Sequence, residues 1–257
     1  MRAKKTLGQN FLNSKAVARD IVRAAELTHR ETILEIGPGK GFLTAELLES
    51  GALVVAVEKD DRMIPLLHEK FSAEIQNKQF VLIHGDIIEM LEKKALKLPA
   101  QYKLVANIPY YLTGYILRAF LEAKSKPSKM VLMVQKEVAT RIVAHDKKES
   151  ILSVAVKAYG EPHLFKKVPA RYFTPAPNVD SAILVINNIS NKNFSSPEQE
   201  QRFFEIVKTG FAHKRKVLAG NLKELFGDNT TEVLKSASIK ENARAEDVSL
   251  AQWLSLI

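Results

Sequence analysis

The chain has 257 residues, of which 46% are hydrophobic, and this is enough to build an α/β core with a smaller domain attached. It contains no cysteine, which excludes disulfides and thiolate zinc sites and is typical of a protein in the reducing cytoplasm. No apolar run approaches the ~18 residues that cross a bilayer, and the net charge of +9 is compatible with a polyanionic partner without identifying one.

The first two-thirds of the chain alternate between helical and strand-like segments. Apolar residues recur at helical spacing in residues 14–27, and residues 42–49 and 150–159 are also expected to be helical. Asp60 is expected to cap the helix that follows it. The alternation predicts a parallel, doubly wound sheet in a Rossmann-like α/β fold. The expected strands are residues 32–36, 53–57, 80–83, 103–106 and 129–134, then 163–168 and 181–186, which should pair as a hairpin at one sheet edge.

The C-terminal part of the chain has a different pattern. Residues 187–197 are rich in Asn and Ser and indicate a linker, and residues 198–257 are expected to be entirely helical. Lys214 would fall on the apolar face of a continuous helix, which predicts a break near His213. We therefore predict a Rossmann-like catalytic domain over residues 1–187 and a small all-helical domain over residues 198–257.

A glycine-rich loop joins the first expected strand to the next helix, with the sequence Glu35-Ile36-Gly37-Pro38-Gly39-Lys40-Gly41. Gly37, Gly39 and Gly41 let the backbone turn tightly and approach a ligand. Their spacing differs from the dinucleotide fingerprint and from the P-loop, and Glu35 would repel a phosphate but could hold an ammonium. S-adenosylmethionine carries an ammonium and a sulfonium but no phosphate, so it is the predicted cofactor.

Two further carboxylates are expected in the cofactor site. Glu58 lies at the end of the second strand, where a carboxylate can bind both ribose hydroxyls. Asp86 follows the third strand and can accept a hydrogen bond from the adenine amine, cap the helix at residues 87–91, or do both. Lys59 and Ile87, which adjoin these two carboxylates, are included in the predicted cofactor site.

The sequence Asn107-Ile108-Pro109-Tyr110 follows the fourth strand and should face the same crevice, because ligands bind outside the carboxyl ends of parallel strands. The amine of adenine is a poor nucleophile, because its lone pair is delocalised into the ring. Acceptors at the Asn107 side chain and the Ile108 carbonyl would favour a more pyramidal nitrogen. Tyr110 offers a face for stacking. We predict adenine N6 methylation, with Asn107 contacting both amine and cofactor; the alternative is a merely structural turn.

A second candidate site is the proline-rich loop that starts at Phe173. An exposed Phe173 could stack on the target base opposite Tyr110, which would offset part of the cost of removing the base from its helix. The alternative is that Phe173 packs in the core, as phenylalanine often does.

These motifs together resemble the KsgA-type ribosomal RNA adenine N6-dimethyltransferase family over nearly the whole chain. Residues 8–12 are similar to the family's N-terminal motif, and the resemblance implies that Asn10 and Leu12 contact the cofactor. Residues 135–139, 173–181 and 211–218 match later motifs. The resemblance implies a class I S-adenosylmethionine-dependent methyltransferase that dimethylates two adjacent adenosines in the 3′-terminal hairpin loop of 16S rRNA. It would act on the small ribosomal subunit during ribosome biogenesis, as a cytoplasmic monomer.

Two departures from the family pattern keep alternatives open. The family more often has Leu where Ile108 stands, and Asn-Ile-Pro-Tyr is common in the related macrolide-resistance enzymes that modify 23S rRNA. Gly114-Tyr115 stands where the family often has a proline, and we have no functional interpretation of it. The remaining alternatives are a non-catalytic assembly factor on the same fold and a DNA adenine or protein-glutamine methyltransferase.

Basic residues recur along the chain, at Lys4-Lys5 and in four later clusters. Among these clusters, Lys214, Arg215 and Lys216 are the residues that we most expect to contact RNA, because they interrupt an otherwise amphipathic helix. The six histidines are scattered without metal-ligand spacing, so no metal is expected.

Overall fold

The computed structural model describes residues 8–257, and its internal contacts divide the chain into two compact units. The first unit comprises the residues up to 139 together with 163–189, and the second comprises 140–162 and 190–257. Residues 140–162 thus group with the C-terminal helices, although they lie within the predicted catalytic range of 1–187. The domain limits themselves stay a prediction.

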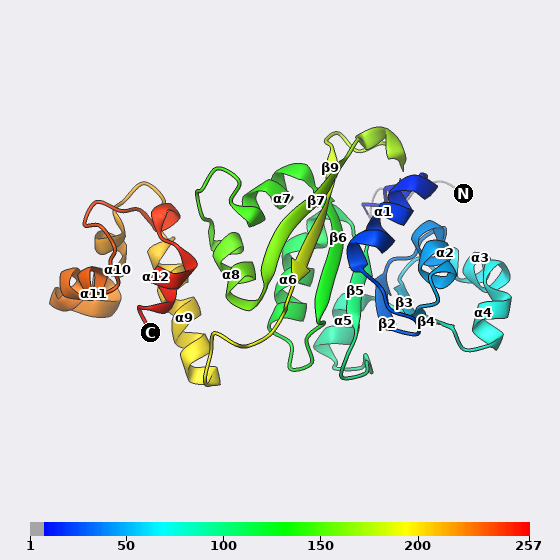
Figure 1. Cartoon of the computed structure of the whole chain (residues 1–257), viewed down its shortest axis with the longest axis horizontal. Helices are drawn as coiled ribbons and strands as arrows, with labels where there is room; N and C mark the ends of the chain where they lie inside the picture. The colour runs from blue at the N-terminus through cyan, green and yellow to red at the C-terminus, as the bar shows by residue number, and fades with distance from the viewer. Residues whose placement is uncertain (1–7) are drawn as a thin grey trace. The chain divides into compact units, whose positions relative to one another are not determined.

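Seven strands form the central sheet in the order β4-β3-β2-β5-β6-β9-β7 (Figure 1). The five from β4 to β6 are parallel, whereas β9 runs antiparallel to β6. The alternation in the sequence therefore predicted the doubly wound sheet correctly, and β9 and β7 are neighbours at one edge as expected. Because β2 pairs with β3 on one side and β5 on the other, the strand order reverses there and opens a crevice at the carboxyl ends. The strands are β2 (Thr32–Ile36), β3 (Leu53–Glu58), β4 (Phe80–His84), β5 (Lys103–Ala106), β6 (Lys129–Gln135), β7 (Glu161–Val168) and β9 (Ser181–Asn187).

Helices cover the sheet, and α1 and α2 pack against one of its faces (Figure 1). Helix α1 begins where Ser14 Oγ accepts the Val17 N–H, and it ends at Glu26, which has left-handed backbone angles. Asp60 does not cap α3, contrary to prediction: the helix begins three residues later, and the Asp60 carboxylate pairs with Arg62 instead. The bounds are α1 (Lys15–Ala25), α2 (Phe42–Glu49), α3 (Met63–Lys70), α4 (Ser72–Gln76), α5 (Ile87–Glu92), α6 (Thr113–Leu121) and α7 (Lys136–Val143).

A second, two-stranded sheet was not predicted. Strand β1 (Phe11–Leu12) pairs antiparallel with β8 (Phe173–Thr174), so that Leu12 lies opposite Phe173. Asn13 extends this connection, because its side-chain amide donates to Thr174 Oγ1 at 2.8 Å and its backbone N–H donates to the Tyr172 carbonyl at 3.0 Å. This pairing holds the N-terminal segment to the loop that precedes β9.

The second unit is built from helices, as the sequence predicted for residues 198–257. Trp253 is fully buried in it, and its ring stacks on Phe211 with centroids 5.7 Å apart. Gly210 must lack a side chain, because an added Cβ would lie 2.4 Å from the Trp253 ring. The predicted break near His213 is confirmed, since α9 ends at Gly210 and α10 starts at Leu218. The helices are α8 (Ile151–Tyr159), α9 (Pro197–Gly210), α10 (Leu218–Phe226), α11 (Thr230–Ser236) and α12 (Leu250–Leu254), with α10 and α11 side by side (Figure 1).

Between residues 8 and 257, no helix combines the length and the apolar character that a membrane crossing requires.

Candidate active site

A cavity lies at the carboxyl ends of the parallel strands, where the strand order reverses. Four parts of the chain line it: the N-terminal segment 8–12, the glycine loop with the start of α2, the ends of β3 and β4, and the turn at residues 107–112. It therefore brings together most of the residues predicted from the sequence to bind cofactor or substrate. Those that line it are Asn10, Leu12, Glu35, Gly37, Gly39, Glu58, Lys59, Asp86, Ile87, Asn107 and Tyr110.

Glu35 is almost completely buried at the end of β2, with 1% of its surface exposed. Thr44 Oγ1 donates to its carboxyl group at 2.8 Å. Burial raises the pKa of Glu35 to about 8, because removal from water penalises the charged form. The carboxyl group is therefore ready to ionise when a cationic group of a ligand comes close.

Glu58 connects the end of β3 to the glycine loop. Its carboxylate accepts the Gly39 N–H at 2.9 Å and the Asp60 N–H at 2.7 Å. Burial raises the pKa of Glu58, and the backbone hydrogen bonds act against this rise. Each carboxylate oxygen has a further lone pair, so Glu58 can still accept hydrogen bonds from a ligand. Gly37 and Gly39 both have positive φ, which allows the loop to turn beside this carboxylate.

Asp86 has the cap position that the sequence suggested, because its Oδ1 accepts the Ile88 N–H at 2.9 Å at the start of α5. The other oxygen, Oδ2, lies 2.6 Å from the Lys59 ammonium. Burial acts to raise the pKa of Asp86, but the hydrogen bonds from Lys59 and Ile88 outweigh it and lower the pKa. Asp86 is thus an ionised acceptor at the edge of the cavity, with Lys59 beside it.

The turn after β5 presents Asn107 and Tyr110 to the cavity. Asn107 Nδ2 donates to the main-chain carbonyl of Asn10 at 3.2 Å. The Tyr110 hydroxyl lies 2.6 Å from Ser181 Oγ, and burial raises the pKa of Tyr110. Tyr110 therefore stays neutral near pH 7, and its ring is held at the hydroxyl end.

Two predicted site residues do not line the cavity. Gly41 packs against the C-terminal end of α3, since an added Cβ would lie 2.5 Å from the ring of Phe71, which follows the helix, and 3.1 Å from Leu67 within it; the missing side chain thus serves the packing of the loop. Phe173 was expected to be exposed, and this was wrong: its side chain is 3% exposed within the core, and its backbone pairs with Leu12. The physical reason is that the pairing of β8 with β1 is accompanied by packing of Phe173 in the same hydrophobic cluster as Phe11 and Leu12, which local sequence patterns do not show.

Other lining residues were missed in the sequence. Gln9 lines the cavity and donates from Nε2 to Asp60 Oδ2 at 2.8 Å. Tyr111 is an exposed aromatic at the cavity, with 64% of its surface accessible. Gln9 and Tyr111 both adjoin residues already singled out. The sequence spacing of Gln9, however, does not indicate its contact with Asp60, which is 51 residues away along the chain.

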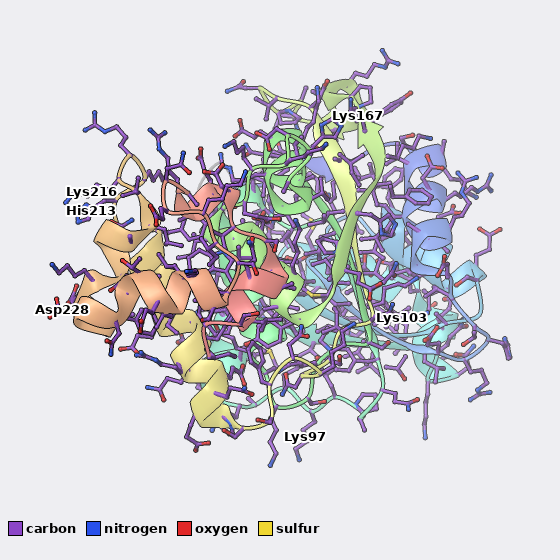
Figure 2. The ribbon with its side chains drawn as sticks, turned by 60° about the vertical axis from the view of Figure 1, so that its left-hand side comes forward. Lys97, Lys103, Lys167, His213, Lys216 and Asp228 are labelled. Carbon is purple, nitrogen blue, oxygen red and sulfur yellow. The ribbon has the colours of Figure 1, made fainter. Side chains whose placement is uncertain are left out.

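The predicted RNA-binding residues lie in the second unit, in the connection between α9 and α10. Lys214, Arg215 and Lys216 are all exposed there. Figure 2 labels Lys216 and His213 at the outer edge of this connection. Lys4 and Lys5 lie outside the described residues.

Comparisons with known proteins agree over the full length. The family model described as ribosomal RNA adenine dimethylase matches residues 1–257. The chain is 42% identical over 259 residues to the ribosomal RNA small subunit methyltransferase A of Dehalococcoides mccartyi (strain CBDB1), covering 100% of this chain and 88% of the relative. It is 37% identical to the protein of that name from Fusobacterium nucleatum, covering 99% and 96% of the two chains.

Solved structures show the same architecture. The crystal structure of the 23S rRNA methyltransferase ErmE matches with a TM-score of 0.78 and 28% identity, covering 96% of this chain and 98% of that one. A dimethyladenosine transferase from Plasmodium falciparum matches with a TM-score of 0.77, covering 96% and 95%; at 23% identity this likeness shows the fold alone. The Rossmann-like methyltransferase fold predicted from the sequence is confirmed.

Proposed function

Because the chain belongs to the ribosomal RNA adenine dimethylase family, we propose that it is an enzyme that transfers methyl groups from S-adenosylmethionine to the N6 amines of two adjacent adenosines of 16S rRNA. Relatives named ribosomal RNA small subunit methyltransferase A, which match essentially the whole chain, support the small ribosomal subunit as the substrate. One structural observation carries the proposal: acidic residues suited to the cofactor and the Asn107 turn line the same cavity.

The residues of the cavity fit the chemical groups of S-adenosylmethionine. Glu35 offers a buried carboxyl group to an ammonium, and Glu58 has free lone pairs for ribose hydroxyls. The space beside Gly37 is open, since a Cβ built on this residue would meet no atom within 4 Å, and the glycine leaves that space to a ligand. When bound, the cofactor supplies an electrophilic methyl group on its sulfonium.

The Asn107 turn prepares the adenine amine. Asn107 Oδ1 and the Ile108 carbonyl each accept a hydrogen bond from one N–H group of the amine. This favours a pyramidal nitrogen whose lone pair is less delocalised into the adenine ring. The Tyr110 ring, held through its hydroxyl by Ser181, offers a face for the base. No strong base of the chain is needed, because the amine proton becomes acidic only as the N–C bond forms. Catalysis then rests on positioning and electrostatics.

Replacing Asn107 tests this function directly. We expect Asn107→Ala to slow methyl transfer by about 100-fold or more, because the amine loses its oriented acceptor. Cofactor affinity should change by only a few-fold, since Glu35, Glu58 and the glycine loop are untouched. The measurement is a single-turnover assay with labelled S-adenosylmethionine and small subunits that lack the modification. Unchanged transfer by Asn107→Ala would remove the turn from the mechanism.

Mapping the labelled nucleotide tests the substrate. Unmethylated small and large subunits are supplied in parallel, and the modified positions and their methyl number are determined. Two dimethylated adjacent adenosines in 16S rRNA are expected. Label confined to 23S rRNA would favour the large-subunit alternative, and 23S rRNA is the substrate named for the structural relative ErmE.

The exposed basic residues 214–216 are proposed to contact RNA phosphates. Reversing all three charges should weaken binding to the small subunit and reduce the slope of log affinity against log salt by about three. The control reverses Lys93, Lys94 and Lys97, which are also exposed and change the net charge equally. Equal losses of affinity in the two variants would point to net charge rather than to this connection.

The cytoplasmic location and the monomeric state remain predictions.

A further inference from the structure

The orientation of the Asn107 amide is determined by the main chain of Asn10. A carbonyl oxygen can only accept a hydrogen bond. The end of the Asn107 amide that lies 3.2 Å from the Asn10 carbonyl must therefore be the NH2 group. The opposite end, Oδ1, is consequently left as the acceptor, which is the role the proposed chemistry requires. If the Asn10 carbonyl moved, the amide would lose the contact that distinguishes its two ends.

Asn10 belongs to a short segment that is fastened on both sides, residues 8–13, which we name the N-terminal strap. On its C-terminal side, Phe11 and Leu12 pair with β8, and Asn13 binds Thr174. On its N-terminal side, Gln9 Nε2 donates to Asp60 Oδ2 at 2.8 Å. The carbonyl that orients Asn107 thus lies between the paired strand β1 and the Gln9–Asp60 hydrogen bond.

Asp60 links this strap to the predicted ribose-binding carboxylate. It is 1% exposed, and its backbone N–H donates to Glu58 Oε1 at 2.7 Å. Its side chain also binds the Arg62 guanidinium, at 2.9 Å from Nε and 2.6 Å from the terminal nitrogen. The acceptor for Gln9 is therefore rigidly held, because a buried carboxyl group that accepts several hydrogen bonds, two of them from a guanidinium, has little freedom.

We propose that Gln9 is a positioning residue for methyl transfer, which holds the strap to Asp60 so that the Asn10 carbonyl keeps the Asn107 amide in its acceptor orientation. The inference rests on the proposed function, because it presumes that Asn107 accepts the adenine amine. It assigns Gln9 a role through the strap and the Asn107 amide rather than through the reacting groups. It also joins the two halves of the site, since Asp60 contacts both Gln9 and Glu58.

The first test compares Gln9→Ala with Gln79→Ala. Gln79 Nε2 also donates a 2.8 Å hydrogen bond between distant segments, to the Leu48 carbonyl, but it lies outside the cavity. We expect Gln9→Ala to lower the single-turnover rate on unmethylated small subunits about tenfold, whereas Gln79→Ala should leave the rate unchanged. Affinity for S-adenosylmethionine should fall less than the rate in Gln9→Ala. Equal rates in the two variants would overturn the inference.

The second test exchanges the partners of the hydrogen bond. Gln9→Glu places two carboxylates in contact and should release the strap, with a larger loss of rate than Gln9→Ala. Adding Asp60→Asn restores a donor and an acceptor in reversed order, with the negative charge still near Arg62. The double variant should recover most of the rate lost by Gln9→Glu, relative to Asp60→Asn alone. A loss that this exchange does not reduce would also overturn the inference, because Gln9 would then act through another group.

Asn107→Ala separates a failure of this inference from a failure of the proposed function. If Asn107→Ala still transfers methyl groups, the proposed chemistry fails and Gln9 has no amide to orient. If Asn107→Ala is inactive while Gln9→Ala behaves like Gln79→Ala, only the role of Gln9 is wrong.

Discussion

The two ends of the central sheet both bury ionisable side chains, but the hydrogen-bond partners of Lys103 at one end differ in kind from those of Glu35 and Glu58 at the other. At the amino end, Lys103 donates to Glu31 at 2.9 Å and to the carbonyls of Ala25 and Glu26 at 3.0 and 2.8 Å, which caps α1. At the carboxyl end, the structure of residues 8–257 shows Glu35 and Glu58 bound by a hydroxyl and by backbone N–H groups rather than by cations.

The pKa values of the acidic residues reflect this difference. The hydrogen bond from Lys129 lowers the pKa of Glu26; for Glu31, burial acts to raise the pKa, but hydrogen bonds from Lys103 and Thr28 outweigh it. Burial raises the pKa of Glu35 and of Glu58. Paired charges at the amino end stabilise the fold, whereas the buried carboxyl groups of Glu35 and Glu58 at the other end are costly until a ligand supplies the complementary groups. In one sheet, the residues at the amino end therefore contribute to stability, whereas Glu35 and Glu58 at the carboxyl end are suited to ligand binding.

The largest expected effect is on stability, at the amino end. Lys103→Met removes the ammonium that two helix-end carbonyls and Glu31 share and leaves Glu31 only its hydrogen bonds from Thr28, so it should lower the free energy of unfolding by about 3 kcal/mol. Urea denaturation measures this. Lys93→Met is the control, because Lys93 pairs with Glu89 on the surface, with side chains 71% and 62% exposed, and should cost less than about 0.5 kcal/mol. Similar losses of unfolding free energy in both variants would show that Lys103 and its partners contribute no more than a surface ion pair.

The next effect is the pH dependence that Glu35 imposes on stability. With an ordinary value of 4.5 and a folded pKa of about 8, the folded chain keeps a proton between these values that the unfolded chain has lost. The free energy of unfolding should therefore fall as pH rises through this window. Between pH 6 and pH 8, the wild type should lose about 2 kcal/mol relative to Glu35→Gln.

Denaturation of both proteins at several pH values measures the effect of Glu35. Glu69→Gln serves as the control, because Glu69 is exposed and the substitution should leave the pH slope unchanged. Parallel curves for the wild type and Glu35→Gln would mean that Glu35 is already ionised in the folded chain.

The smallest expected effect is on cofactor affinity, at the carboxyl end. Glu58→Gln keeps one acceptor oxygen but loses the charge, and it should weaken S-adenosylmethionine binding about tenfold, which is about 1.4 kcal/mol. Isothermal titration calorimetry measures this. Glu31→Gln, at the amino end, should bind the cofactor as the wild type does. An unchanged affinity in Glu58→Gln would contradict the assignment of ligand binding to the carboxyl end of the sheet.

Several features of the site could be predicted from sequence because they depend on neighbours along the chain. The glycine loop, Glu58, Asp86 and Asn107 each lie at or just beyond the carboxyl end of a parallel strand, and the carboxyl ends of parallel strands meet at the same end of the sheet. The Asp86 cap likewise involves residues only two apart. The break before α10 followed from Lys214 interrupting an apolar face, since a charged side chain is costly to bury.

The sequence alone thus determined the alternation of strands and helices in the central sheet and the end of the sheet where the cavity forms, because periodicity and strand ends are local properties. The chemistry assigned to the carboxylates and to the Asn107 turn stays a prediction from the sequence. Only the tertiary structure decided that β1 pairs with β8, that Phe173 is buried, that Gly41 packs on Phe71 and that Gln9 reaches Asp60. These contacts join segments up to about 160 residues apart, as Asn13 and Thr174 illustrate. They depend on how the whole chain packs, and no local pattern of residue types specifies such pairings.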